Sequence, residues 1–105
     1  MPAKEVVFQL RKLAREPLNR QRIVSDKTCL GGLVAFLEND DEEVVCMALE
    51  SLQYLASNHE LRGGLASEPG LMTKARKLML HGPPSCKEVA CNVYSALQGA
   101  LNQET

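Results

Sequence analysis

The stretch EVVCMALESLQYLA at residues 43–56 is written almost a second time as EVACNVYSALQGAL at residues 88–101, which lies 45 positions later. The identical positions of the two copies are Glu43/Glu88, Val44/Val89, Cys46/Cys91, Leu52/Leu97 and Gln53/Gln98. In the first copy, apolar residues recur three and four positions apart, which predicts an amphipathic helix. The chain therefore contains an internal helical repeat, and this repeat decides the fold.

Other parts of the chain extend the repeat at an offset of 42 residues. The segment LRKLA at residues 10–14 aligns with LQYLA at residues 52–56, and residues 23–37 align with residues 65–79. The three extra residues are Pro83, Pro84 and Ser85, in the turn before the last helix. Self-similarity at 42 to 45 residues is the period of an α-solenoid unit, whose helices bury a core only by stacking on the next unit.

We expect seven helices, near residues 3–15, 18–25, 28–38, 42–57, 59–66, 69–80 and 85–101. Pro17 should end the first helix, because proline disfavours helical geometry in the residue before it. Asp40 with Glu43, and Ser85 with Glu88, have the spacing of capping boxes. Further breaks are expected at Gly63-Gly64, Pro69-Gly70 and Gly82-Pro83-Pro84. The prediction is one domain over residues 1–101, followed by a frayed tail at residues 102–105.

Composition narrows the classes of function. The 105 residues are 45% hydrophobic and carry a formal net charge of −1, so no strong field steers the chain toward nucleic acid. No apolar run approaches the length of a membrane-spanning helix. The basic residues Arg11, Arg15, Arg20 and Arg22 allow at most a peripheral membrane contact. Four cysteines without a secretory signal predict reduced thiols in a cytosolic or nuclear protein.

One short and two longer helices in about 42 residues resemble the armadillo repeat. Within that superfamily, QLRKLAREPLNRQRIVSDKTCLGGLVAFLEN at residues 9–39 and ALESLQYLA at residues 48–56 resemble the family of armadillo-repeat-containing protein 1. The resemblance is specific over the first half of the chain, and the second half matches as a generic repeat. It implies an all-α, right-handed superhelix of about two full three-helix repeats plus one preceding helix.

The resemblance also implies a function. Its members are described as adaptors linked to the cytosolic face of mitochondria and to organelle distribution. This implies a cytoplasmic, non-catalytic scaffold without a cofactor, which binds a protein partner of unidentified kind. Members carry a further C-terminal domain similar to heavy-metal-associated folds, and these 105 residues stop before such a domain. Whether the chain is a fragment, a short isoform or a member without that domain stays open, as does its oligomeric state.

Armadillo proteins often bind extended peptides along the groove of their third helices. In nuclear-import adaptors, asparagines clamp the peptide backbone, but the corresponding positions here are Lys12, Tyr54 and Gly99, so that ladder is absent. For a different protein ligand, Met47, Glu50 and Tyr54 are expected on one stripe of the fourth helix, away from its core stripe. The flanking candidates are Lys12, Asn92 and Ser95. The competing interpretation is a solvated face with one half-buried tyrosine.

Two alternatives use other residues. The first is a structural module that stacks through its end helices on another domain or on a second copy. Joint exposure of Val7 and Phe8 would favour it. The second is thiol or metal chemistry, which needs two cysteines, or a cysteine and a histidine, within bonding reach. The spacing of Cys86 and Cys91, with His81 five residues before Cys86, fits the zinc pattern loosely, but no second pair of ligands lies nearby in the sequence. We therefore expect no metal site and no catalytic residue, with the cysteines acting as small packing residues.

Overall fold

In a computed structural model, which describes residues 2–102, all the regular secondary structure is helical. The helices are α1 (Ala3–Arg15), α2 (Pro17–Ser25), α3 (Lys27–Phe36), α4 (Glu42–Ala56), the 3₁₀ turn η1 (His59–Leu61), α5 (Arg62–Ala66), α6 (Leu71–His81) and α7 (Pro84–Asn102). No strand occurs within these residues. The all-α, armadillo-like fold expected from the repeat is therefore confirmed.

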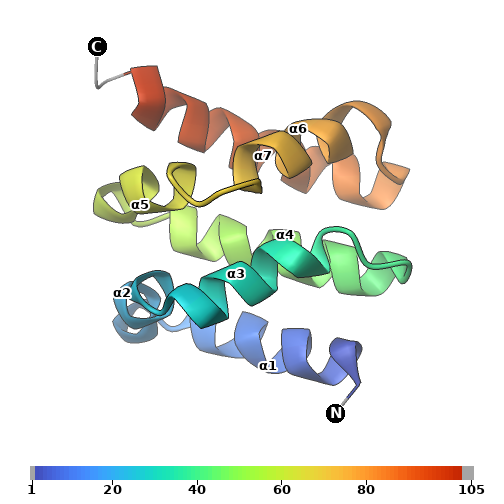
Figure 1. The fold of residues 1–105 in the computed structure, drawn as a ribbon, viewed down its shortest axis with the longest axis horizontal. Coiled ribbons are helices and arrows are strands. Elements are labelled where there is room, and N and C mark those ends of the chain that lie inside the picture. The colour runs from blue at the N-terminus through green and yellow to red at the C-terminus, as the bar shows by residue number, and fades with distance from the viewer. Residues whose placement is uncertain (1, 103–105) are drawn as a thin grey trace.

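The three longest helices lie side by side as one layer. In Figure 1, α1, α4 and α7 run in the same direction, with α4 in the middle, and α1 packs on α4 while α4 packs on α7. The shorter helices α3 and α6 lie in front of this layer in the view, and α2 and α5 lie near one end. The unit α2–α4 thus ends in a long helix, and so does the next unit, α5–α7, as the 42-residue period predicts.

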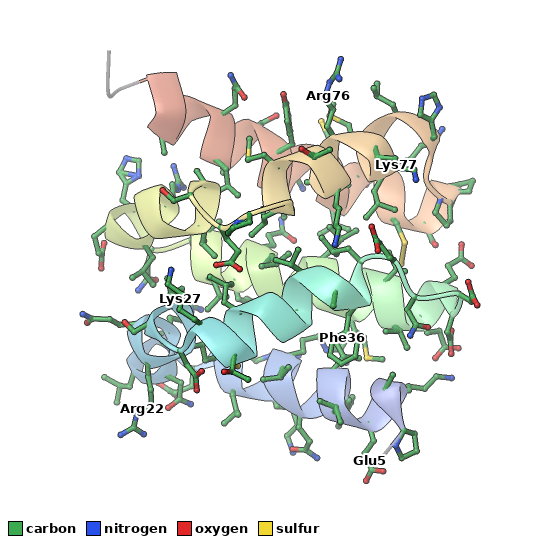
Figure 2. All side chains as sticks on the ribbon, in the orientation of Figure 1. Glu5, Arg22, Lys27, Phe36, Arg76 and Lys77 are labelled. Atoms are coloured by element: carbon green, nitrogen blue, oxygen red, sulfur yellow. A yellow bond between two sulfur atoms is a disulfide. The ribbon has the colours of Figure 1, made fainter. Side chains whose placement is uncertain are left out.

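The core lies around α4, which is covered by neighbours on both sides. Leu49, Leu52 and Leu55 of α4 are fully buried, and so is Leu97, the repeat equivalent of Leu52. Burial of a leucine side chain contributes about 1.5–3 kcal/mol relative to its exposure. Charged side chains such as Glu5, Arg22 and Arg76 instead project from the surface (Figure 2). The stacked units share one continuous core.

A repeated arginine contact fixes the turn from each long helix to the next unit. Arg20 Nε donates to the carbonyl oxygen of Ala14 at 2.8 Å, and Arg62 Nε donates to that of Ala56 at 2.7 Å. The two pairs are related by the 42-residue offset. Arg20 also donates to Asn58 Oδ1 at 2.9 Å, which joins the first corner to the second. Such charge-assisted bonds satisfy carbonyls that the end of a helix leaves unpaired.

Most predicted helix ends are accurate to two residues, and the differences have local causes. α2 begins at Pro17, one residue before the predicted start at residue 18, because proline is favourable at the first helical position. α6 begins at Leu71 because Gly70 adopts a left-handed conformation with φ 82°. The break predicted at Gly63-Gly64 is wrong, since both lie within α5. A Cβ on Gly64 would lie 3.3 Å from Val24 Cγ1, so glycine permits close packing there.

The two predicted capping boxes are also wrong. α4 is capped by Asp41, whose Oδ1 accepts from the Glu43 N–H at 2.9 Å. Asp40 is displaced from this role because Asn39 Oδ1 accepts from the Asp41 N–H at 2.8 Å and thereby positions Asp41. Ser85 lies inside α7, which begins at Pro84, and its hydroxyl donates to Glu42 Oε1 at 2.9 Å. It therefore links two helices and does not cap one.

Replacing Asp41 by alanine should lower the free energy of unfolding by about 1 kcal/mol, because the Glu43 N–H loses its acceptor. The same change at the neighbouring Asp40, which is exposed and caps nothing, should shift it by less than about 0.5 kcal/mol. Urea unfolding followed by circular dichroism measures both values. Equal losses at the two positions would contradict the assignment of Asp41 as the cap.

The structure describes only the first residue of the predicted C-terminal tail. α7 extends to Asn102, one residue beyond the predicted helix end, and the rest of the predicted frayed tail, residues 103–105, lies outside the described residues. Of the helices described, none combines the length and the apolar character needed to cross a membrane.

Candidate partner-binding groove

The layer of long helices is hollowed between α1 and α4. A hollow of about 660 Å³ lies there, which we call the α1–α4 hollow. Its lining residues are Pro2, Lys4, Glu5, Phe8, Arg11, Glu43, Cys46, Met47 and Glu50. Phe8 forms an apolar wall and is 41% exposed, whereas Met47 lies at the base with 8% exposed. This hollow is mainly apolar with charged residues around it, the usual character of a recognition site.

A second hollow continues across α4 toward α7. This α4–α7 hollow has a volume of about 350 Å³ and is lined by Cys46, Glu50, Gln53, Ser85, Glu88, Val89 and Asn92. Cys46 and Glu50 line both hollows, so the two adjoin along α4. Together they form what we call the long-helix groove, which crosses α1, α4 and α7. The helices that line it, α1, α4 and α7, each end a repeat unit, which is the position from which the resemblance predicts a groove.

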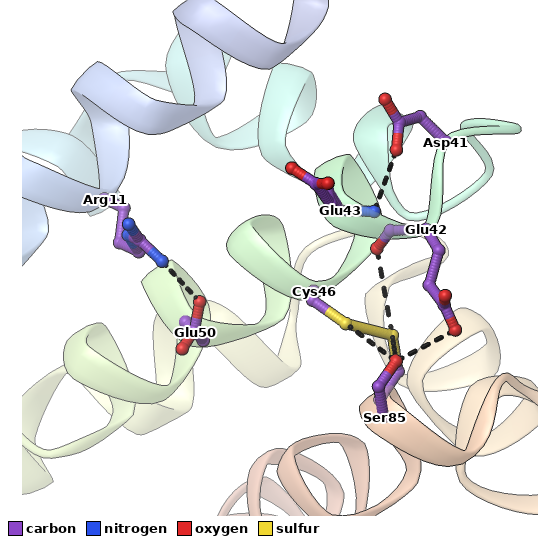
Figure 3. Close-up of a disulfide and its surroundings, with 8 residues drawn as sticks. Arg11, Asp41, Glu42, Glu43, Cys46, Glu50 and Ser85 are labelled. Carbon is purple, nitrogen blue, oxygen red and sulfur yellow. Dashed lines mark hydrogen bonds and ion pairs between the residues drawn. A yellow bond between two sulfur atoms is a disulfide. The ribbon is translucent and has the colours of Figure 1, made fainter.

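Ion pairs hold the side chains of the α1–α4 hollow. Arg11 Nη1 donates to Glu50 Oε1 at 2.7 Å across the junction of α1 and α4 (Figure 3). At the other end, Lys4 Nζ lies 3.3 Å from Glu43 and 3.4 Å from Asp41. The hydrogen bond with Glu43, together with the negative charges of Asp41 and Glu43, raises the pKa of Lys4. Both basic groups are thereby positioned before any ligand arrives.

The Arg11–Glu50 pair should show a coupling free energy of about 1 kcal/mol, near the upper end for a partly exposed ion pair. We expect this because the bond is short and 24% of the Arg11 side chain is exposed. The measurement is a double-mutant cycle of Arg11→Met and Glu50→Gln in urea unfolding. The coupling should fall as salt is raised, and a coupling of zero at low salt would show that the pair is not formed in solution.

Two of the six predicted site residues line the groove as expected. Glu50 lies at its centre, and Asn92 borders the α4–α7 hollow from α7. Met47 also lines the groove, but the expectation that it lies away from the core is wrong. Its side chain is buried and belongs to the core, because α1 packs across α4 at this position. Only a small part of Met47 is therefore available to a ligand.

The other three predicted residues line neither hollow of the groove. Lys12 is exposed on α1 with Nζ 5.9 Å from the centre of the Phe8 ring, and Ser95 is exposed on α7. Tyr54 is half-buried, and the guanidinium groups of Arg15 and Arg20 lie 5.9 and 6.0 Å from its ring centre. The tyrosine thus contributes cation–π contacts at the α1–α2 corner. A role of Lys12, Tyr54 and Ser95 in partner binding stays a prediction.

Sequence reasoning missed some of the residues that α1 and α7 contribute to the groove. Arg11 and Val89 were not among its candidates, and Phe8, which aligns with a ligand-holding position of the armadillo repeat, was left out of the final set. The identification of Arg11 requires knowing that α1 packs on α4, since 39 residues separate it from Glu50. Contacts at such separation have no local pattern in the sequence.

The cysteines depart furthest from expectation. The structure joins Cys46 of α4 to Cys86 of α7 in a disulfide, whereas four reduced thiols were predicted (Figure 3). Cys29 and Cys91 are free. The packing role expected for Cys91 is also wrong, because it is exposed: within residues 2–102 no further helix covers that side of α7. Cys46 and Cys86 are thus within bonding reach of each other, as thiol chemistry requires.

Among the described residues, the free cysteines and the histidines form no second reactive cluster. Burial, and to a smaller extent Asp26, raises the pKa of the Cys29 thiol, which opposes formation of a nucleophilic thiolate at that position. In the described part of the chain, no group of three or more histidine, cysteine or carboxylate residues could hold a metal ion.

The joint exposure of Val7 and Phe8, which would favour stacking through the end helices, is not found. Val7 is fully buried and only Phe8 is exposed, so the two do not form a joint apolar surface. Leu13 and Leu18 are nevertheless 47% and 89% exposed, at the end of α1 and the start of α2. The apolar residues left at this end of the fold are therefore different from those expected.

Comparison with known proteins identifies homologues of the chain. Armadillo repeat-containing protein 1 of Gallus gallus is 40% identical over 100 residues, and the proteins of that name from Bos taurus and Mus musculus are 38% identical. Each match covers 93% of this chain and 36% of the relative, so the chain spans about a third of the length of the curated relatives it matches. The resemblance found in the sequence is confirmed, and it extends into the second half of the chain. No protein-family model matches the chain, and no solved structure matches it significantly.

Proposed function

From its homology with armadillo repeat-containing proteins, we propose that this chain is a non-catalytic protein-binding module that holds a partner segment in the long-helix groove. One observation carries the proposal: Phe8 is left 41% exposed at the wall of a hollow of about 660 Å³. A large exposed aromatic beside a preformed hollow is a frequent anchor of protein interfaces.

The groove suggests the chemistry of the partner segment. Its charged residues are four carboxylates, Glu5, Glu43, Glu50 and Glu88, and two basic groups, Lys4 and Arg11. Both basic groups already have carboxylate partners, whereas no ion pair holds Glu88 among the described residues. A fitting segment therefore places an apolar side chain against Phe8 and a basic side chain near Glu88. Gln53 and Asn92 offer amides to its backbone.

The wider setting of the function is proposed on the resemblance alone. We place the chain in the cytoplasm at the cytosolic face of mitochondria, as an adaptor in the organisation of that organelle. The near-neutral net charge argues against nucleic acid as the partner and for at most a peripheral membrane contact. Cell fractionation and fluorescence microscopy of the tagged chain test this setting separately from the groove.

The groove is tested by quantitative affinity purification of three forms of this chain from cells: the natural sequence, a Phe8→Ala/Glu50→Gln variant and a Leu80→Ala variant. Leu80 is the matched control, because it is 48% exposed on α6 and lines none of the hollows described. Partners that bind in the groove should fall roughly tenfold or more with the first variant, the usual effect of losing a hot-spot aromatic. They should be retained with Leu80→Ala.

Circular dichroism must show that all three forms are equally helical. A set of partners that is unchanged by the groove variant, or lost equally with Leu80→Ala, would overturn the proposal. Purified segments of a captured partner then allow the predicted preference for an apolar residue next to a basic one to be measured by titration.

A second candidate function rests on Leu13 and Leu18, whose exposure leaves an apolar corner uncovered. In this alternative, the α1–α2 corner stacks on another domain or on a second copy of the chain. Light scattering over a range of concentrations should then show dimers that Leu13→Asp/Leu18→Asp abolishes. If the chain is a monomer at all concentrations, self-association is excluded and only stacking on a different protein remains. The Leu13→Asp/Leu18→Asp variant tests that possibility in the affinity purification, where it should lose the stacking partner.

A further inference from the structure

Cys46 and Cys86 lie where two repeat units meet. Cys46 is in the second turn of α4, Cys86 is in the first turn of α7, and their Cα atoms are 5.4 Å apart although 40 residues separate them in the chain. This distance lies well within the range that disulfides require. The helix packing itself, through α4 and α7, holds the two backbones at this separation, so the pair is brought together without a mobile loop.

The two sulfur atoms differ in access. Cys86 is fully buried, whereas Cys46 is half-buried and lines both hollows of the long-helix groove. A small thiol or disulfide that enters the groove therefore meets Cys46 first. Cys86 can react only with the Cys46 sulfur itself, once that sulfur is held in a mixed disulfide. This division of roles, between an accessible thiol and a resolving thiol, is the arrangement of a redox-responsive pair.

The surroundings also accommodate the reduced form. The Sγ of Cys86 lies 4.0 Å from the carbonyl oxygen of Glu42, and the Sγ of Cys46 lies 3.5 Å from Ser85 Oγ. Ser85 in turn donates to Glu42 Oε1, so its oxygen is free to accept from a Cys46 thiol (Figure 3). Each thiol would have an acceptor, and reduction would leave no buried donor unpaired. Both redox states therefore fit the same helix packing.

We propose that Cys46 and Cys86 form a reversible thiol–disulfide site, which small disulfides of the glutathione class oxidise and which stiffens the α4–α7 junction of the long-helix groove. Any effect on binding rests on the proposed function. Disulfides of cytosolic proteins are usually transient or redox-sensing, so a reversible bond agrees with the setting proposed above.

The reaction balances as a two-step exchange. The Cys46 thiolate attacks one sulfur of glutathione disulfide, forms a mixed disulfide at Cys46 and releases one glutathione thiolate. The Cys86 thiolate then attacks the Cys46 sulfur and releases the second glutathione. The two electrons reduce the sulfur–sulfur bond of the oxidant, and the two thiol protons end on the two released glutathione molecules.

The test is equilibration of this chain in glutathione buffers of graded ratio, followed by alkylation of free thiols and peptide mass spectrometry. The parent is Cys29→Ser/Cys91→Ser, because no lysine or arginine separates Cys29 from Cys46 and trypsin leaves both in one peptide. We expect the peptide of residues 28–62 to be joined to that of residues 78–87 under oxidising conditions. The link should disappear under reducing conditions and form again on reoxidation.

Two single variants in this parent separate the roles of the two thiols. Cys86→Ser should accumulate a glutathione adduct at Cys46, because the resolving thiol is missing. Cys46→Ser should leave Cys86 nearly unmodified, because that sulfur is buried. Equal adducts in the two variants, or no link between Cys46 and Cys86 in any buffer, would overturn the proposal.

The stiffening is read by amide hydrogen exchange, which reports local opening. Exchange in residues 43–48 and 85–90 should be about tenfold slower in the oxidised parent than in the reduced parent. The Cys46→Ser/Cys86→Ser variant should show no difference between the two conditions. If exchange is the same in both redox states, the stiffening is refuted. None of these measurements uses a partner, so their failure is distinguishable from failure of the groove to bind one.

Discussion

Reduction of the Cys46–Cys86 disulfide should lower the free energy of unfolding by about 4 kcal/mol. A disulfide stabilises mainly by restricting the unfolded chain, and the effect grows with the length of the closed loop. The loop here spans 40 residues, which lies between the short and long loops for which about 3 and 4.7 kcal/mol are expected. Since single domains have only about 5–15 kcal/mol of stability, the reduced protein should unfold at distinctly lower urea concentration.

The measurement is urea unfolding with and without a reductant that leaves circular dichroism undisturbed. Cys29→Ser/Cys91→Ser should show the full loss, because neither free cysteine takes part in the bond. Cys46→Ser/Cys86→Ser should already unfold as easily as the reduced protein and should not respond to reductant. A reductant-sensitive stability in this last variant would assign the effect to other cysteines and contradict the pairing.

Leu52→Ala should lower the free energy of unfolding by about 3 kcal/mol, within the range of about 2–5 kcal/mol found for buried leucines. Leu52 is fully buried in α4, the helix that packs on both α1 and α7. Deletion of its side chain removes contacts in the middle of the layer and leaves a cavity, because rigid helices on both sides limit collapse. A large part of the chain's stability therefore depends on this one side chain.

Leu18→Ala is the matched control for Leu52→Ala, since it removes the same atoms from a helix position that is 89% exposed. It should change the free energy of unfolding by less than about 0.5 kcal/mol. Both variants are compared with the natural sequence in urea unfolding at one fixed redox state. Similar losses at the two positions would mean that burial does not explain the effect and would contradict the placement of Leu52 in the core.

The arrangement of the helices could be predicted well, and the residues of the groove only in part. The repeat placed seven helices in the right order, and Pro17 marked the boundary between α1 and α2. The errors at Asp40 and Ser85 concern single hydrogen bonds, which depend on side chains such as Asn39 and Glu42 that the capping pattern does not include. Local rules identify that a helix begins near a residue, but the surrounding contacts select which side chain caps it.

The candidate site shows the same division. Glu50 and Asn92 were predicted on the side of their helices that borders the groove, because the 3.6-residue period assigns each residue of a helix to a side. Met47 lies next to that side, and only the position of α1 decides that it is buried. Phe8 and Arg11 complete the hollow from a different helix. The amphipathic pattern shows which face of a helix is apolar, but it does not show which other helix covers each end of that face.

The sequence by itself determined the all-helical class, the 42- to 45-residue unit and the alignment of α1, α4 and α7 as equivalent helices. These follow from periodicity and from proline and glycine positions, which act over a few neighbouring residues. Only the tertiary structure decided that Arg11 meets Glu50, that Cys46 meets Cys86 and that Phe8 borders a hollow. Each of these depends on the rotation and offset between long helices about 40 residues apart, which many side-chain contacts set together and no short stretch encodes.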